Sequence, residues 1–117
     1  MKYMLLIYGD EREWEALTEQ QQAEVYRDYD AYHSALRAAA KTPEGAQLHA
    51  TRTAKSVRVR DGRRSVTDGP FAETAEQLAG YYLIDCEDLD EALDWAARIP
   101  AAAVGTIEVR PLMQTPG

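Results

Sequence analysis

The feature that most constrains the fold is an unbroken run of six apolar residues near the start of the chain, from Tyr3 to Tyr8, closed by Gly9 and Asp10. A strand with one face in water alternates apolar and polar residues, whereas a continuous apolar run of this length is typical of a strand buried on both faces. We therefore predict a central strand here. The run is far too short to span a membrane, which needs roughly 20 residues.

Two helices are predicted from their caps and their apolar spacing. Thr18 and Gln21 have the spacing of a capping box, which predicts a helix from about Glu19 to about Ala40. Asp88 predicts the start of a second helix, which Pro100 ends. Apolar and aromatic residues recur in both at steps of three and four, so each helix has one face for a core.

Residues 56–67 carry the strongest hairpin signal, because two alternating segments flank Asp61-Gly62. A two-residue loop places Val57 opposite Val66, whereas a three-residue loop would place an arginine there, so apolar matching selects the tighter register. The exposed face of this hairpin then carries Arg58, Arg60 and Arg63. Two further strands are predicted at Gly80–Cys86 and Thr106–Arg110.

This order of elements is close to the split βαβ plan. The predicted fold class is α+β, a ferredoxin-like antiparallel sheet that includes the hairpin and carries the two main helices on one face. A chain of 117 residues suits one domain, so we assign residues 1–117 to a single unit. Because the first strand is apolar on both sides, the other face of the sheet also needs a cover. A second copy in a homodimer is the simplest one.

Charge and cysteine content limit what the protein can bind. Lys and Arg number 13 against 20 Asp and Glu, and the net charge of -7 disfavours nucleic acid and anionic membranes as partners. A single cysteine, Cys86, and two histidines cannot build a closed zinc site. We therefore expect a cytoplasmic protein without metal or cofactor, whose partners are a second copy of the chain and a small organic ligand.

The most unusual local sequence runs from Asp68 to Thr74 and reads Asp-Gly-Pro-Phe-Ala-Glu-Thr. One interpretation is a turn, because Gly supplies positive φ, Pro fixes φ and Asp can hydrogen-bond its own backbone. The functional interpretation is that a rigid turn presents Asp68 as a general acid or base, with Glu73 as a second candidate and Phe71 against a ligand.

His33 and Tyr29 lie on the apolar stripe of the first helix. One interpretation is that both are packed residues with satisfied polar atoms. The other is a small polar pocket between helix and sheet, in which His33 and Asp68 share a proton and Tyr29 orients a ligand. The functional interpretation requires that the Asp68 turn and this helix face border one cavity.

Three segments carry a resemblance to a known family: Met1–Gly9, the run from Val66 to Asp85 with its Asp-Gly-Pro-Phe string, and the ending from Ala92 to Leu112. Over nearly the whole chain, the sequence resembles the DGPF branch of the YCII-related family. The resemblance implies a ferredoxin-like subunit that pairs into a dimeric α+β barrel, and a His and Asp pair suggested as catalytic. Asp68 matches that Asp, whereas the position of the His falls nearest Tyr29, with His33 one turn later.

Two functions stay open at this point. One is an enzyme that transfers protons on a small organic molecule without a metal, with Asp68 and His33 as its catalytic groups. The other is a noncatalytic dimeric module that binds a small molecule or a protein in a regulatory role. Convergence of Asp68 and His33 around a cavity favours the enzyme, and an Asp68 that only caps its own turn favours the module.

Overall fold

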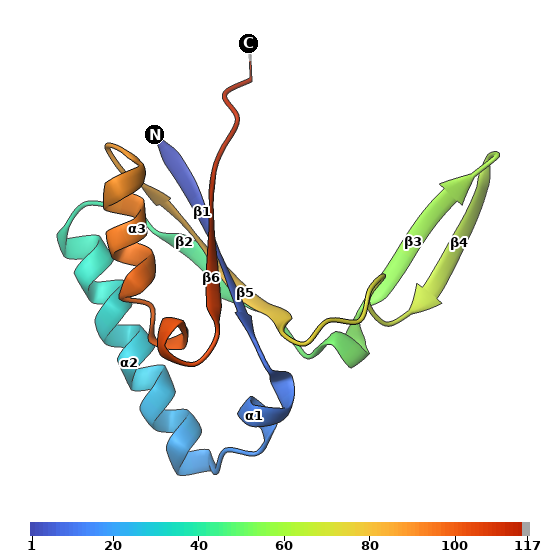
Figure 1. Ribbon diagram of the computed structural model, residues 1–117, viewed down its shortest axis with the longest axis horizontal. Coiled ribbons are helices and arrows are strands. Elements are labelled where there is room, and N and C mark those ends of the chain that lie inside the picture. The colour runs from blue at the N-terminus through green and yellow to red at the C-terminus, as the bar shows by residue number, and fades with distance from the viewer. Residues whose placement is uncertain (116–117) are drawn as a thin grey trace.

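The computed structural model describes residues 1–115, and its centre is a four-stranded antiparallel sheet in the order β2-β5-β1-β6 (Figure 1). The strands are β1 (Lys2–Gly9), β2 (Glu44–Gln47), β5 (Gln77–Asp85) and β6 (Thr106–Pro111). β1 pairs with β5 on one side and β6 on the other, so the predicted central strand is confirmed. The chain is α+β, and its sheet is consistent with the ferredoxin-like plan. Of the unit predicted over residues 1–117, the last two lie outside the described residues.

Two helices, α2 (Glu19–Ala38) and α3 (Leu89–Ala97), cover one face of this sheet, as predicted (Figure 1). The Gln21 N–H donates to Thr18 Oγ1 over 3.1 Å, and the Thr18 N–H donates back to Gln21 Oε1 over 2.9 Å. The Asp88 carboxylate accepts from the Glu91 N–H over 2.9 Å. These caps satisfy N–H groups that the first turn of a helix leaves free, which is why both helices begin where the sequence predicts.

The core lies between the sheet and these two helices. Alternate side chains of β1, those of Tyr3, Leu5 and Ile7, are buried in it. The Tyr32 hydroxyl of α2 donates to the Trp95 carbonyl of α3 over 2.8 Å, which joins the two helices. The rest of the buried set is Leu36, Tyr82, Ile84, Cys86, Ala92, Ala96 and Ile99. Burial of this apolar surface is the main favourable contribution to folding.

The opposite side of the sheet, which we call the open face, is left uncovered by residues 1–115. Met4, Leu6 and Tyr8 of β1 lie on this side and are only half-buried. The paired strand β5 adds Tyr81 and Leu83 in register with them. Charged side chains stand on the two flanking strands: Glu44, Glu108 and Arg110. β1 is therefore apolar to both sides, as predicted, with a cover on one of them.

The hairpin forms with the predicted register. β3 (Lys55–Arg60) and β4 (Arg63–Asp68) pair around a two-residue loop, with Val57 opposite Val66. This hairpin, which we call the arm, projects from the sheet on the side opposite α2 and α3 (Figure 1). Its projection gives the chain a Cα radius of gyration of 16.4 Å, against about 13 Å for a compact chain of this length.

The prediction that the hairpin belongs to the main sheet is wrong, because the arm is a separate two-stranded sheet and β2 takes the place beside β5. The sequence does not predict β2, because its four residues, Glu-Gly-Ala-Gln, show no alternation of apolar and polar side chains. All four are exposed in the structure. Gly45 permits the close pairing, because a Cβ there would overlap the Tyr81 carbonyl oxygen.

Three short helical segments also escape prediction: α1 (Glu11–Glu15) and the 3₁₀ helices η1 (Thr51–Thr53) and η2 (Pro100–Ala103). Each is too short to show a helical period in the sequence. Residues 1–115 contain no helix with the length and hydrophobicity to cross a membrane.

Candidate functional site

The structure places Asp68 at the base of the arm, where its carboxylate pairs with the Lys55 ammonium, and 86% of the Asp68 side chain is exposed. Other groups hold the turn that follows. The Gly69 N–H donates to the Ala54 carbonyl over 2.7 Å, and the Ser56 hydroxyl donates to the Gly69 carbonyl over 2.8 Å. Gly69 has a φ of 89°, which a glycine adopts without strain. The Asp68 carboxylate is therefore open to a second molecule.

Phe71 and Glu73 lie in the segment between the arm and β5, and both side chains are exposed. Phe71 is 83% exposed, which is a high fraction for a large apolar ring. The Thr74 hydroxyl donates to the Glu76 carbonyl, and Gln77 Nε2 donates to the Thr74 carbonyl over 2.7 Å. These bonds turn the segment into the start of β5. The ligand contacts of Phe71 and Glu73 stay a prediction.

His33 and Tyr29 of α2 pack against β5 on the helix side of the sheet. The Tyr29 and Tyr82 rings stack with centroids 6.5 Å apart, and the His33 ring lies 6.0 Å from the same Tyr82 ring. Burial raises the pKa of the Tyr29 hydroxyl to about 12, and burial raises the pKa of the Tyr32 hydroxyl as well. These hydroxyls therefore stay protonated at neutral pH.

A single chain does not bring Asp68 and His33 together. α2, which carries His33, covers one face of the sheet, and the arm, which ends at Asp68, projects on the other side (Figure 1). The arm, with Asp68 at its base, is a separate two-stranded sheet, and α2 packs against the main sheet. The catalytic roles of Asp68 and His33 stay predictions.

The structure instead gathers polar groups at one end of the open face, in a hollow of about 550 Å³ that we call the β1–β6 hollow. Its lining residues are Tyr8, Thr74, Glu76, Thr106, Ile107 and Glu108. The Tyr8 hydroxyl donates to Glu108 Oε1 over 3.4 Å, and Arg110 Nη2 donates to Oε2 of that carboxylate over 3.2 Å. Two donors from two strands therefore orient the Glu108 carboxylate.

A hydroxyl and two carboxylates in one hollow suit a small molecule that carries hydrogen-bond donors. Carboxylates are also groups that can exchange a proton with such a molecule. In the part of the chain that the structure describes, no three His, Cys, Asp or Glu side chains are arranged to hold a metal ion. The hydroxyl and carboxylate groups of the hollow are therefore available for hydrogen bonds to such a molecule.

Tyr8 and Glu108 do not stand out as site candidates in the sequence alone. The signal that could have found them is the alternation of β6, which places Glu108 on the side of the sheet that carries Tyr8. A charged residue on an otherwise apolar sheet face is an informative observation. It becomes visible only when the register of β6 on β1 is known.

The architecture is that of a small α+β protein with one helix-covered sheet face and one open face. Comparison with known proteins agrees with this class: residues 1–116 match the family model described as the YCII-related domain. The chain is also 44% identical over 114 residues to an uncharacterized protein of Rhizobium meliloti (strain 1021), a match that covers 96% of this chain and 92% of that relative. The chain therefore belongs to the YCII-related family.

The raised pKa of Tyr29 predicts how stability depends on pH. The folded protein holds the Tyr29 proton up to a pKa of about 12, whereas the ordinary pKa of a tyrosine hydroxyl is 10.0. Unfolding therefore releases a proton between these values, and the free energy of unfolding falls as pH rises through that window. Below pH 10 the contribution of protonated Tyr29 to the free energy of unfolding is fully present. Denaturant unfolding from pH 8 to pH 12 measures it.

The matched variant for this prediction is Tyr29→Phe, which keeps the ring and removes the titrating group. We expect it to show a shallower loss of stability between pH 10 and 12 than the wild type. An unchanged slope in Tyr29→Phe would contradict the assignment of this pH dependence to Tyr29.

Proposed function

We propose that the protein acts as a homodimer in which the open faces of two copies pack against each other and enclose a small-molecule site. This is the dimeric α+β barrel arrangement that the family resemblance implies. The observation that carries the proposal is the apolar open face, whose central side chains are only half-buried in one copy. Monomeric proteins rarely leave a continuous apolar patch of this kind in water.

The composition of the open face supports pairing with itself. Its centre is apolar and its charged side chains, of both signs, stand on the flanking strands β2 and β6. An apolar centre with a polar rim is the usual anatomy of an interface, and a two-fold axis brings the same patch of two copies together. Such a pairing leaves the helices of both copies on the outside.

A second copy over the open face would also enclose the β1–β6 hollow. Water would then be excluded from the Tyr8 hydroxyl and the Glu76 and Glu108 carboxylates, which line it. Exclusion of water strengthens hydrogen bonds between these groups and a ligand. The ligand class that fits is a small organic molecule with hydrogen-bond donors and an apolar part for the sheet.

Two further assignments belong to this proposal. The string Asp68–Thr74 supports a place in the DGPF branch of the family. The cytoplasm is the compartment that suits its free and buried thiol, Cys86, because thiols stay reduced there.

The second candidate is an enzyme that uses Asp68 for metal-independent proton transfer. The observation that favours it is the position of Asp68, exposed and held by a rigid turn at the base of an arm that projects from the open side. Phe71 and Glu73 follow within a few residues and would contact the same substrate. In a dimer, this carboxylate would complete a site with groups of the other copy.

The proposed dimer is tested by a substitution that introduces a charge at the apolar centre of the open face. Leu6 lies half-buried in the centre of that face, so Leu6→Arg should weaken the dimer by at least about tenfold, which corresponds to about 1.4 kcal/mol. Light scattering over a range of micromolar concentrations measures the dissociation constant. Circular dichroism checks that the variant is folded.

The control is the same substitution on the other side of the molecule. Leu93 of α3 is 45% exposed on a helix, so Leu93→Arg should leave the dimer unchanged. A wild-type protein that stays monomeric at these concentrations, or a dimer that Leu6→Arg does not weaken, would contradict the pairing of open faces.

The ligand site is tested by a thermal-shift screen of small organic molecules on the wild type, Glu108→Gln and Asp68→Asn. Molecules that bind in the β1–β6 hollow should raise the unfolding temperature of the wild type and of Asp68→Asn, but much less that of Glu108→Gln. The control Glu13→Gln changes an exposed carboxylate of α1. If molecules raise the unfolding temperature of Glu108→Gln as much as that of the wild type, the binding site lies elsewhere. If a bound molecule is turned over by the wild type and Glu108→Gln but not by Asp68→Asn, the second candidate is favoured.

A further inference from the structure

The two faces of the arm differ, because one carries its three valines and the other carries polar side chains alone. Directly opposed residues of paired strands share a face, which places Val57, Val59 and Val66 together, with Arg64 opposite Val59 and the pair Lys55 and Asp68 at the base. The other face carries Ser56, Arg58, Arg60, Arg63, Ser65 and Thr67. This alternation is typical of a hairpin with one face covered. The three valines are nevertheless 59%, 59% and 48% exposed, so residues 1–115 of the same chain do not supply the cover.

Without a cover, few packing contacts stabilise the arm. Every side chain of its two strands is exposed apart from that of Ser56. An isolated two-stranded hairpin is at best marginally stable in water, and it becomes stable when an apolar face packs against another surface. Phe71, just beyond the base of the arm, is 83% exposed and adds to the uncovered apolar surface.

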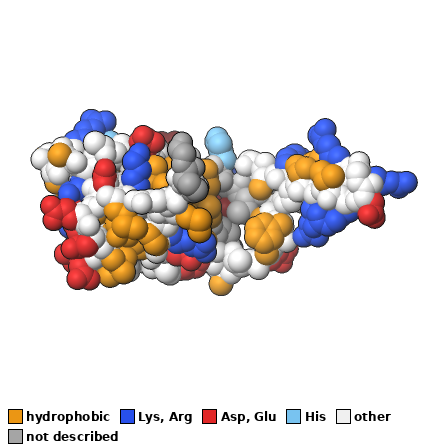
Figure 2. All heavy atoms as spheres, turned by 90° about the horizontal axis from the view of Figure 1, so that it is seen from above, with side chains coloured by type: hydrophobic (Ala, Val, Ile, Leu, Met, Phe, Trp, Pro, Cys, Tyr) orange, Lys and Arg blue, Asp and Glu red, His pale blue; other side chains and the backbone are white. Residues whose placement is uncertain are grey.

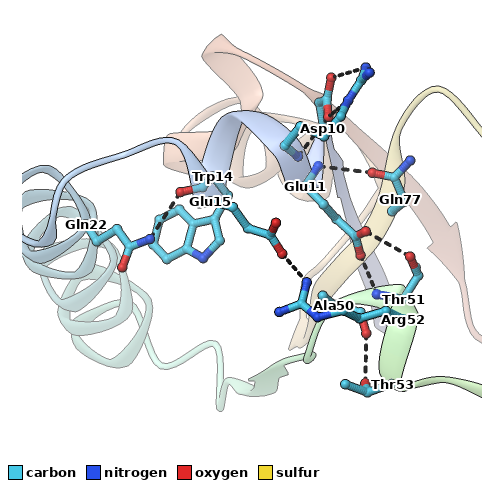
Figure 3. A network of polar contacts seen from close by, with 11 residues as sticks. Asp10, Glu11, Trp14, Glu15, Gln22, Ala50, Thr51, Arg52, Thr53 and Gln77 are labelled. Carbon is cyan, nitrogen blue, oxygen red and sulfur yellow. Dashed lines mark hydrogen bonds and ion pairs between the residues drawn. The ribbon is translucent and has the colours of Figure 1, made fainter.

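The base of the arm is nevertheless firmly attached to the sheet (Figure 3). The Glu11 carboxylate of α1 accepts from the Thr51 N–H over 2.6 Å and from the Thr51 hydroxyl over 2.8 Å. The Glu11 N–H donates to Gln77 Oε1 at the start of β5 over 3.0 Å, and Glu15 pairs with Arg52. These contacts fix η1, from which β3 begins, so the direction of the arm is set before any partner arrives.

The arm and the rest of the chain have opposite net charges. Residues 55–68 contain five Lys and Arg against two Asp, whereas the rest of the chain contains eight Lys and Arg against 18 Asp and Glu. Figure 2 shows cationic side chains gathered on the arm and acidic ones at the far end of the body. The body of a second copy therefore offers the arm a surface of the opposite sign, which favours association.

We propose that the arm docks on a second copy of this chain, with its valine face against that copy and its arginines toward the acidic body. The inference rests on the proposed homodimer, because the arm and the open face lie on the same side of the sheet (Figure 1). A copy that packs on the open face therefore lies beside the arm. The two-fold axis gives two arms, each of which clasps the other copy.

The arm contact is tested by a photo-crosslinking amino acid placed at Val59, on the valine face. Irradiation of the dimer should give covalent dimers, at least severalfold more than the same amino acid placed at Arg58, whose side chain lies on the polar face. Light scattering on the same samples measures whether the dimer is present. Crosslinking and dimer formation are therefore read separately.

A pair of variants tests how much the valine face of the arm contributes to the stability of the dimer. The double variant Val59→Asn with Val66→Asn replaces two of the three valines on this face, and we expect the dimer dissociation constant to rise at least tenfold. Arg58→Asn is the control on the opposite face, with an expected change below threefold.

The outcomes separate the two proposals. A dimer whose position 59 crosslinks no better than position 58, and whose valine variants dissociate like the wild type, would overturn the docking of the arm and leave the pairing of open faces standing. A monomer at all concentrations would overturn both. Crosslinks from position 59 that form only to nucleic acid, or only to another protein, would also overturn the docking on a second copy.

Discussion

The rest of the structure depends on the apolar character of β1 on both of its sides. On one side, Tyr3, Leu5 and Ile7 are buried beneath α2 and α3 and form the middle of the core. On the other, Met4 and Leu6 lie on the open face and are only half-buried. Complete burial of a leucine or methionine side chain contributes about 1.5–3 kcal/mol to stability. Met4 and Leu6 are only half-buried, so a second surface that covers them would add the rest of this stabilisation. The proposed homodimer follows from this imbalance.

The position of the arm follows from the strand that pairs with β5 at the edge of the sheet. β2 occupies the place beside β5, and the hairpin that follows it in the chain is left outside the main sheet. The contacts of α1 with η1 and β5 then fix the base of the arm on the open side. The arm and the apolar centre of the sheet therefore lie on the same side of the molecule (Figure 1), where one partner can contact both.

The elements with strong local signals could be predicted from the sequence: the capping box of α2, the N-cap of α3, the apolar run of β1 and the Asp61-Gly62 hairpin register all agree with the structure. What failed was the assembly of the hairpin into the sheet, because the short polar strand β2 has no apolar pattern. The structure places Asp68 at the base of the arm and His33 on α2, and it brings Tyr8 and Glu108 together beside the β1–β6 hollow. Their proximity depends on the register of two strands about 100 residues apart, which local patterns do not contain.

Hydrogen exchange of the backbone amides, followed by mass spectrometry at several protein concentrations, tests the central claim that a second copy covers the open side. We predict that peptides from β1 and from residues 55–68 are protected at concentrations where the dimer forms, and that the arm loses its protection on dilution together with dimer dissociation. Arm amides that exchange as fast as those of an unfolded peptide at every concentration, in a protein that light scattering shows to be dimeric, would contradict the claim for the arm. The same rapid exchange in a protein that never dimerises would contradict the whole account.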